Sequence, residues 1–327
     1  MNGLLSFADV GKYRYICRLE WHLVACAEEY MRYLSVKEYG DAYGISERTV
    51  RNWCAAGKMQ GAFLTGKTWN IPDDVPIPRR SRVRMSRLLE SLQEEKELNI
   101  KEGIYHKTQV DFTYNSNRIE GGCLTLKQTA GIFENNAVGV TEGEINVDDI
   151  VMTANHFCCI DYVIDHAGDS LSESLIKELH SILKTGTSDS RKFWFNVGEY
   201  KRLPNEAGDA ETSLPKEVPA LMKELVRQYN AKKSRTLEDI MDFHCKFECI
   251  HPFQDGNGHV GRLIMFKECL ANGITPFIIT DILKQYYFRG LQEWGNVNTY
   301  MTETCQIAQD QYKAMMGYIE SRSQSDR

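Results

Sequence analysis

The residue types that could do chemistry gather in Ile250–Arg262, which reads I-H-P-F-Q-D-G-N-G-H-V-G-R. His251 can accept a proton near neutral pH, and Asp255 can hold Mg²⁺, which prefers oxygen ligands. The glycines of the turn at 256–258 can direct backbone N–H groups towards an anion at the start of a helix. Arg262 offers a planar fork to a phosphate. This spacing predicts phosphoryl-transfer chemistry, and the alternative is a surface loop that leads into an ordinary helix.

The same stretch resembles the Fic family signature, H-P-F-x-[D/E]-G-N-G-R-x-x-R, with His259 where the family has its first arginine. Members of that family mostly transfer AMP from ATP to a protein hydroxyl. The resemblance implies a mainly α fold, namely a Fic-type helical bundle with a small β-hairpin flap. It covers roughly residues 101–319. We therefore expect a protein adenylyltransferase that uses ATP and Mg²⁺ and acts on a protein substrate.

The resemblance also implies a role for each residue of the motif. His251 would be the general base that takes the proton from a Ser, Thr or Tyr hydroxyl, Phe253 would anchor the loop, and Asp255 would bind Mg²⁺. Arg262 would pair with the terminal phosphates and fix the orientation of ATP, and Asn257 would belong to the catalytic residues. The motif residues expected to bind the nucleotide are Gly256, Asn257, Gly258, His259, Gly261 and Arg262.

His259 departs from the family pattern. Histidine is mostly neutral at pH 7 and lacks the guanidinium fork. Loss of one charged phosphate contact costs about 2–3 kcal/mol. A slow enzyme, an altered nucleotide preference and a binding-only protein remain open, and we favour a retained but weakened transferase.

Ser116–Gly121 resembles the [S/T]-x-x-x-E-[G/N] inhibitory motif of Fic proteins, here N-terminal to the catalytic stretch. Ser116 and Glu120 are four residues apart and so share one helix face. The Glu120 carboxylate would pair with Arg262 and occupy the place that the ATP γ-phosphate needs. The alternative is a plain helix C-terminus closed by two glycines.

Two further segments resemble parts of the Fic nucleotide site. Phe193–Leu203 breaks the helical pattern and predicts a two-stranded flap that holds the target by strand addition; a surface hairpin without a role is the alternative. The residues expected over the nucleotide are Val197, Gly198, Glu199 and Tyr200. In Gln285–Leu291, Tyr287 is the candidate to pack on adenine, although a core tyrosine would look the same.

The stretch 35–72 predicts a separate small domain. Ser35 caps a helix at 36–43, Gly44 turns the chain, Ser46 caps a helix at 47–56, and 60–71 forms a hairpin. This order resembles the winged helix-turn-helix of MerR and excisionase-like DNA-binding domains. The residues expected to face DNA are Arg48, Thr49, Arg51, Asn52 and Lys67.

Charge favours that interpretation. Residues 35–87 hold ten Lys/Arg and five Asp/Glu, a net charge of +5, so the rest of a chain with a total of −6 carries −11. Such asymmetry is typical of a chain in which one part contacts nucleic acid. A small helical domain with a solvated polar face is the alternative. A DNA-binding regulator that senses nucleotide without chemistry is accordingly the second functional hypothesis.

The whole chain sets the remaining expectations. Its 327 residues, 42% hydrophobic and 26% charged, fit a soluble globular protein. Ten scattered cysteines, no apolar run of membrane length and no secretory leader indicate free thiols in a reducing cytoplasm. His244, Cys245, Cys249 and His251 lack zinc-finger spacing, so no zinc is expected. The oligomeric state is left open, with a homodimer as one alternative.

The segments follow from these patterns. We expect a lead-in at 1–34, the winged domain at 35–75, a linker and connecting helix at 76–100, a Fic domain at 101–320 and a disordered tail at 321–327. Long helices are expected at 85–113, 124–143, 147–166, 171–184, 219–230, 236–249, 258–272 and 301–319.

Overall fold

The computed structural model describes residues 32–55, 59, 61–73, 75, 87–139, 144–207 and 210–325. The chain divides into two compact units, an N-terminal unit (Met1–Pro78) and a C-terminal unit (Arg79–Arg327). Most of the lead-in expected at 1–34, and the linker residues 76–86, lie outside the described residues. No described helix combines the length and apolar character needed to cross a membrane.

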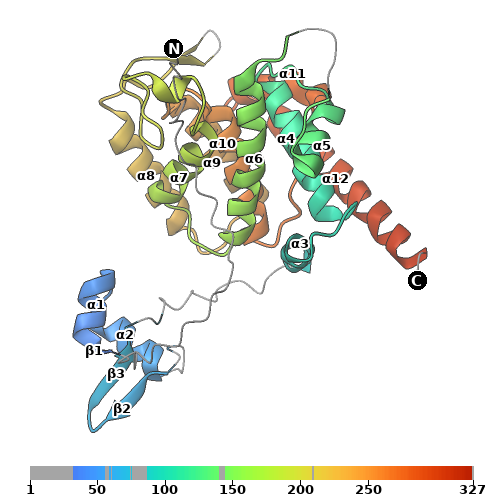
Figure 1. Ribbon diagram of the computed structural model, residues 1–327. Helices are drawn as coiled ribbons and strands as arrows, with labels where there is room; N and C mark the ends of the chain where they lie inside the picture. Colours follow the sequence, from blue (N-terminus) through green and yellow to red (C-terminus); the bar gives the residue numbers. More distant parts are fainter. Residues whose placement is uncertain are drawn as a thin grey trace, which may run out of the picture. The chain divides into compact units, whose positions relative to one another are not determined.

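The N-terminal unit contains a small antiparallel sheet and two helices (Figure 1). Its elements in chain order are β1 (Tyr33–Ser35), α1 (Val36–Tyr43), α2 (Glu47–Ala55), β2 (Phe63–Thr65) and β3 (Thr68–Pro72). The sheet order is β1-β3-β2, so β3 is central. The helices and the hairpin are confirmed, whereas β1 was not predicted, because three residues carry too little periodic signal.

Local capping and a small core hold this unit together. The Ser35 hydroxyl accepts from the Glu38 N–H while the Glu38 carboxylate accepts from the Ser35 N–H, which confirms the predicted capping box. Gly44 has φ 65°, the left-handed conformation that ends α1. The core residues are Val36, Tyr39, Val50, Cys54, Met59, Ile71 and Val75.

The C-terminal unit is a helical bundle (Figure 1). Its long helices are α3 (Arg87–Glu97), α4 (Ile104–Ile119), α5 (Leu126–Asn135), α6 (Val147–Asp165), α7 (Glu173–Lys184), α8 (Val218–Ala231), α9 (Leu237–Ile250), α10 (Asn257–Ala271), α11 (Lys284–Gln292) and α12 (Thr299–Ser325). Two short 3₁₀ helices, η1 (Asp189–Arg191) and η2 (Asp281–Leu283), and the hairpin β4 (Glu206–Ala207) and β5 (Ala210–Glu211) complete the described elements. The fold is therefore mainly helical, as expected.

Helix α10 is the centre of the bundle. It packs against α4, α6, α7 and α9 (Figure 1), and its residues are buried along nearly its whole length. Even its charged pair is internal, since Lys267 Nζ lies 2.7 Å from Glu268 Oε1 with both side chains buried. A helix buried on all sides fixes the direction of its N-terminus, and the motif residues begin there.

Four sequence predictions of structure are wrong. The helix expected at 124–143 ends at Asn135, because Asn136 adopts the left-handed conformation with φ 51°. The single helix expected at 85–113 is two helices, because Asn99 and Glu102 have φ of 50° and 59° and break the chain between α3 and α4. The tail expected to be disordered from Ser321 continues α12 to Ser325. The two-stranded flap expected at Phe193–Leu203 contains no strand, and the hairpin lies further on, at β4 and β5.

The physical reason for the missing strands is the neighbouring helix α7. The N–H of Gly198 donates to the Nδ1 atom of His180, 2.9 Å away. The Glu199 carboxylate pairs with Lys177 at 2.6 Å, and the Tyr200 hydroxyl donates to Glu173 at 2.7 Å. These contacts tie the segment to α7 instead of to a second strand.

Candidate active site

The motif residues lie on the loop between α9 and α10 and on the first two turns of α10. His251 ends α9 in the left-handed conformation, with φ 51°, and Gly256 precedes α10 with φ 83°. A non-glycine residue rarely adopts positive φ, and such residues cluster at functional sites. The loop therefore places its side chains at the buried N-terminus of the central helix.

The Asn257 side chain braces this loop. Its Oδ1 atom accepts from the N–H of Phe253 and its Nδ2 atom donates to the Phe253 carbonyl, both at 2.8 Å. The Phe253 ring is fully buried and stacks on His180 with ring centroids 4.0 Å apart. Phe253 thus anchors the loop, whereas Asn257 acts on the loop's own backbone.

His251 is largely buried, and burial lowers its pKa. Its Nδ1 atom lies 3.3 Å from the main-chain oxygen of Glu248. Because a carbonyl can only accept, Nδ1 carries the hydrogen and Nε2 keeps its lone pair. The imidazole is therefore held in the tautomer that a general base needs, with Nε2 as the reactive atom.

Asp255 is held by two residues of α7. The Lys184 ammonium lies 2.6 Å from Asp255 Oδ2 and is 2% exposed, whereas the Asp255 side chain is 58% exposed. Burial is the largest single effect on the pKa of Asp255 and raises it. The charge and hydrogen bond of Lys184, with smaller contributions from the Gly256 N–H and His259, together outweigh burial and lower the pKa overall. The Nε2–H of His180 donates to the Asp255 main-chain oxygen at 3.2 Å. The carboxylate thus already has one cationic partner.

Arg262 is buried and is bound by the end of α4. Its Nε donates to the Ser116 hydroxyl at 3.1 Å, and its Nη2 donates to the Ser116 carbonyl at 3.2 Å. The same Nη2 lies 2.8 Å from Glu120 Oε1. A methyl group on Gly258 would overlap the Glu120 carboxylate, so Glu120 packs directly against the start of α10. The predicted partners Ser116, Glu120 and Arg262 are together, 142 to 146 residues apart in sequence.

His259 is buried and uncharged. Burial and, next, the Arg262 charge lower its pKa to about 3. Its Nε2–H donates to the Oδ1 atom of Asn117 at 2.9 Å, and Asn117 Nδ2 donates to the Thr153 hydroxyl at 2.8 Å. At the place where the family signature has an arginine, this chain therefore presents a neutral ring engaged with α4.

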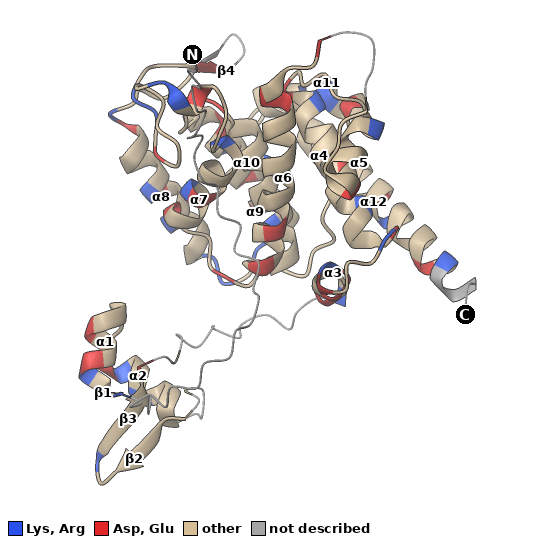
Figure 2. Ribbon diagram, viewed as in Figure 1, with Lys and Arg blue, Asp and Glu red and all other residues tan. Residues whose placement is uncertain are grey.

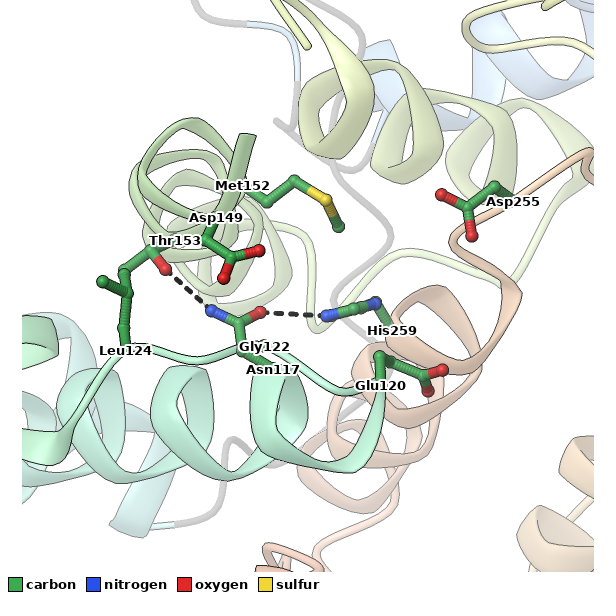
Figure 3. Close-up of a pocket in the computed structure, with 9 residues that line it drawn as sticks. All are labelled: Asn117, Glu120, Gly122, Leu124, Asp149, Met152, Thr153, Asp255 and His259. Atoms are coloured by element: carbon green, nitrogen blue, oxygen red, sulfur yellow. Dashed lines mark hydrogen bonds between the residues drawn. The ribbon is translucent and has the colours of Figure 1, made fainter. Parts of the chain in front are cut away.

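A pocket of about 150 Å³ opens beside these residues (Figure 3). Its walls come from the end of α4, from α6 and from the start of α10 (Figure 3). The residues that line it are Asn117, Glu120, Gly122, Leu124, Asp149, Met152, Thr153, Asp255 and His259. Three of them are carboxylates, and the Lys184 and Arg262 cations sit behind this wall, each paired with one of the carboxylates.

Other predicted residues lie elsewhere in the C-terminal unit. Tyr287 is 1% exposed, its hydroxyl is 2.7 Å from His244 Nε2, and Arg262 lies over its ring with 6.0 Å to the centroid. An adenine could reach this ring only after rearrangement. Gly261 is buried, and a methyl group there would meet Glu248 and His244. The segment that holds Val197 faces α7, as described above.

The charged residues expected to face DNA lie on the N-terminal unit. Arg48, Arg51 and Asn52 are exposed on α2, and Lys67 is exposed at the β2–β3 turn. Figure 2 colours the Lys and Arg positions of α2 blue. Arg51 pairs with Glu47 at 2.9 Å. The fifth residue, Thr49, is only half-exposed and bonds to the Ser46 hydroxyl.

Sequence reasoning missed several residues of the site. Lys184 and His180 are four apart on α7, and Asn117 lies one residue beyond Ser116, but nothing local tells which of them turns inward. Glu248 is three residues before His251, a spacing at which a helix does bring two side chains together. That spacing is the sequence signal from which Glu248 could have been predicted to lie beside His251.

Comparison with known proteins finds a known domain in this part of the chain. Residues 170–269 match the Fic/DOC family model. The chain contains a Fic/DOC domain. The matched residues run from the start of α7 into α10, so they include both the motif loop and the lysine and histidine that hold Asp255.

Named relatives agree with this domain. The proteins called protein adenylyltransferase Fic from Drosophila sechellia and Drosophila melanogaster are each 27% identical over 198 residues, 58% of this chain and 38% of theirs. The chain thus spans less than half the length of the curated relatives that it matches.

Solved structures agree on the fold. A Fic domain-containing signalling protein from Bacteroides thetaiotaomicron has a TM-score of 0.56 at 25% identity, over 70% of this chain and 91% of that one. Fic-1 from C. elegans has a TM-score of 0.56 at 19% identity, over 73% and 72%, which supports the fold alone.

Proposed function

We propose that this protein is a protein adenylyltransferase that transfers AMP from ATP to a protein hydroxyl and is held inactive by Glu120. The observation that carries the proposal is that one braced loop holds His251 and Asp255 directly before α10, the helix that carries Arg262. The named relatives support the same reaction class. The 2.8 Å contact between Glu120 and Arg262 supports the inhibition.

The proposed reaction is an in-line displacement at the α-phosphorus. His251 Nε2 takes the proton as the hydroxyl O–H bond breaks, the oxygen bonds to phosphorus, and the bond to pyrophosphate breaks. Backbone N–H groups of Gly256, Asn257 and Gly258 and the Arg262 guanidinium hold the phosphates. Tight bracing by Asn257 keeps these donors fixed.

Mg²⁺ fits at Asp255. Mg²⁺ is often bound by one or two carboxylates together with water and substrate phosphates, and the Asp255 carboxylate is more than half exposed at the pocket. When bound, the ion would neutralise charge on the phosphates. Lys184 competes for the same carboxylate oxygen, so metal binding must displace or share that ion pair.

The β4–β5 hairpin is the segment we propose to hold the target. Its base is fixed to the motif loop, because Asn205 Nδ2 donates to the Phe253 carbonyl at 2.8 Å and the Lys201 N–H donates to the Pro252 carbonyl at 2.8 Å. Lys201 Nζ also donates to Thr212 at 2.7 Å. A target strand added to this hairpin would bring its hydroxyl near His251.

Transfer of radiolabelled AMP from ATP tests the function. The Glu120→Gly variant, with Mg²⁺ and cell lysate, should label itself or a lysate protein. Adding His251→Ala to that variant should abolish the label. Absence of any label from the Glu120→Gly protein would overturn the enzyme proposal.

A second proposal concerns the N-terminal unit, which we infer to bind DNA. The exposure of Arg48, Arg51 and Asn52 on α2, with Lys67 on the hairpin turn, favours it. The full chain should bind duplex DNA with an affinity that falls as salt rises, and a Lys67→Ala change should reduce the steepness of that fall. Salt-independent binding, or none, would refute it.

A further inference from the structure

Glu248 is a buried carboxyl beside the proposed base that the reaction above does not use. It lies on α9, one turn before His251, and its side chain is 12% exposed. Its Oε2 atom is 3.8 Å from the Nδ1 atom of His251. The carboxyl therefore faces the nitrogen that carries the hydrogen and not the reactive Nε2.

The surroundings of Glu248 do not satisfy it. Its Oε1 atom is buried and has no hydrogen-bond partner among the described residues, and the same holds for His244 Nδ1, 4.0 Å away. A methyl group on Gly261 would lie 2.5 Å from Oε1, so the carboxyl occupies space that only glycine leaves free. An unsatisfied buried carboxyl costs stability, and a purely structural role would be better served by an apolar side chain.

The charge of Glu248 depends on its neighbours from five elements. The titratable and charged side chains that face it or sense its charge are His244, Cys245 and Cys249 of α9, His251 of the loop, Arg262 of α10, Glu120 after α4 and Tyr287 of α11. Burial and, next, the like charge of Glu120 raise the pKa of Glu248 to about 8, while Arg262 opposes them. Its charge state therefore changes within the pH range in which the protein can be assayed.

We propose that Glu248 is a positioning residue whose ionised carboxylate stabilises the imidazolium that His251 becomes when it accepts the hydroxyl proton. The inference rests on the proposed function of His251 as a base. An anion a few ångströms from an imidazolium favours the charged form. Since Glu120 opposes the ionisation of Glu248, the inhibitory glutamate acts on the base as well as on Arg262.

The test compares Glu248→Gln with its parent, both carrying Glu120→Gly. Glutamine keeps the shape and removes only the charge, so the two proteins should transfer AMP equally at the acid end of the pH profile, where Glu248 is protonated. The Glu120→Gly background moves that point to lower pH, because the like charge of Glu120 is gone. At about pH 9 the glutamine variant should be about 10- to 100-fold slower in kcat, by analogy with the loss seen when the outer carboxylate partner of a metal-bound histidine is removed. A packing role predicts an equal loss at both pH values, and that result would overturn the proposal.

A second readout does not need activity. The NMR signal of the His251 ring, followed against pH in the full chain, should show an extra inflection from Glu248 in the parent and lose it in Glu248→Gln. Glu268→Gln is the matched control, because Glu268 is also a buried glutamate but contacts Lys267 and Tyr229; it should retain the inflection. An unchanged His251 titration in Glu248→Gln would refute the proposal.

The two readouts separate the possible failures. If no variant transfers AMP but the His251 titration still depends on Glu248, the proposed function fails and the coupling stands. If Glu248→Gln does not fold, Glu248→Asp keeps the charge and withdraws it by one methylene. That variant should weaken the extra inflection and lose part of the activity at high pH, whereas unchanged behaviour would count against the proposal.

Discussion

Release of Arg262 from Glu120 gives the most direct prediction about this site. In the structure one Nη2 atom serves both the Ser116 carbonyl and Glu120, at 3.2 and 2.8 Å. Glu120→Gly removes the carboxylate and leaves the contacts to Ser116 in place. Arg262 would then be fixed in position with a free donor for a phosphate.

The expected gain in ATP affinity follows from the geometry and the exposure of the Glu120–Arg262 contact. A hydrogen bond to a charged group contributes about 1.5–3 kcal/mol. The Glu120 side chain is 38% exposed, so solvent screening reduces the contribution to about 1–1.5 kcal/mol. ATP no longer has to displace the carboxylate, and its Kd should fall about 5- to 12-fold.

Calorimetric titration measures this change, with Mg²⁺ and an ATP analogue whose α–β bridging atom is carbon, so that no transfer occurs. Glu120→Gln is the matched control: its amide keeps an acceptor for Arg262 and lacks the charge, so its gain should be smaller. If Glu120→Gly binds the analogue no more tightly than the parent, Glu120 does not limit Arg262 and the inhibitory reasoning is wrong.

Three further variants test residues on or beside the same loop. His259→Arg, in the Glu120→Gly protein, should tighten ATP binding about 30- to 150-fold, the equivalent of the 2–3 kcal/mol of one charged phosphate contact; calorimetry that finds no gain would show that the neutral ring is not what weakens binding. Lys184→Met should raise the affinity for Mg²⁺ in the presence of the analogue, because Asp255 loses its competing cation. The Lys184–Asp255 pair stabilises the fold at pH values above the ordinary pKa of an aspartate, and this stabilisation is lost as pH falls through the lowered pKa of Asp255. The free energy of unfolding of Lys184→Met should therefore depend less on pH in the acid range. An unchanged pH dependence would contradict the pairing. Asn257→Ala should lower the free energy of unfolding by about 1–3 kcal/mol through its two lost bonds to Phe253, and urea unfolding with a smaller loss would show that the loop is held otherwise.

The sequence predicts the features whose causes are local. The Ser35 capping box needs only residues three apart, and the motif loop needs only glycines and a proline in order. The sequence did not predict the helix break after α3, because Asn99 and Glu102 adopt positive φ, which sequence periodicity does not reveal. The sequence did not predict the displaced hairpin, because the bond of the Gly198 N–H to His180, 18 residues earlier on α7, leaves no local sequence signal.

The contacts within the site between residues far apart in sequence could likewise not be predicted from spacing. Lys184 lies 71 residues before Asp255, and no spacing rule connects them. Glu120 and Arg262 were paired only through the resemblance to Fic proteins. The geometry adds two contacts that the resemblance did not imply. The Lys184 ammonium lies on the proposed metal ligand Asp255, and the Glu248 carboxyl lies beside the proposed base His251.

The close packing around Gly261 limits which substitutions this part of the protein can accept. A methyl group there would lie 2.5 Å from Glu248 Oε1 and 2.7 Å from the His244 ring. The three positions therefore form one combinatorial unit. In a library randomised at 261 alone, glycine should be the main survivor. Larger residues at 261 should be recovered only together with smaller side chains at 244 or 248.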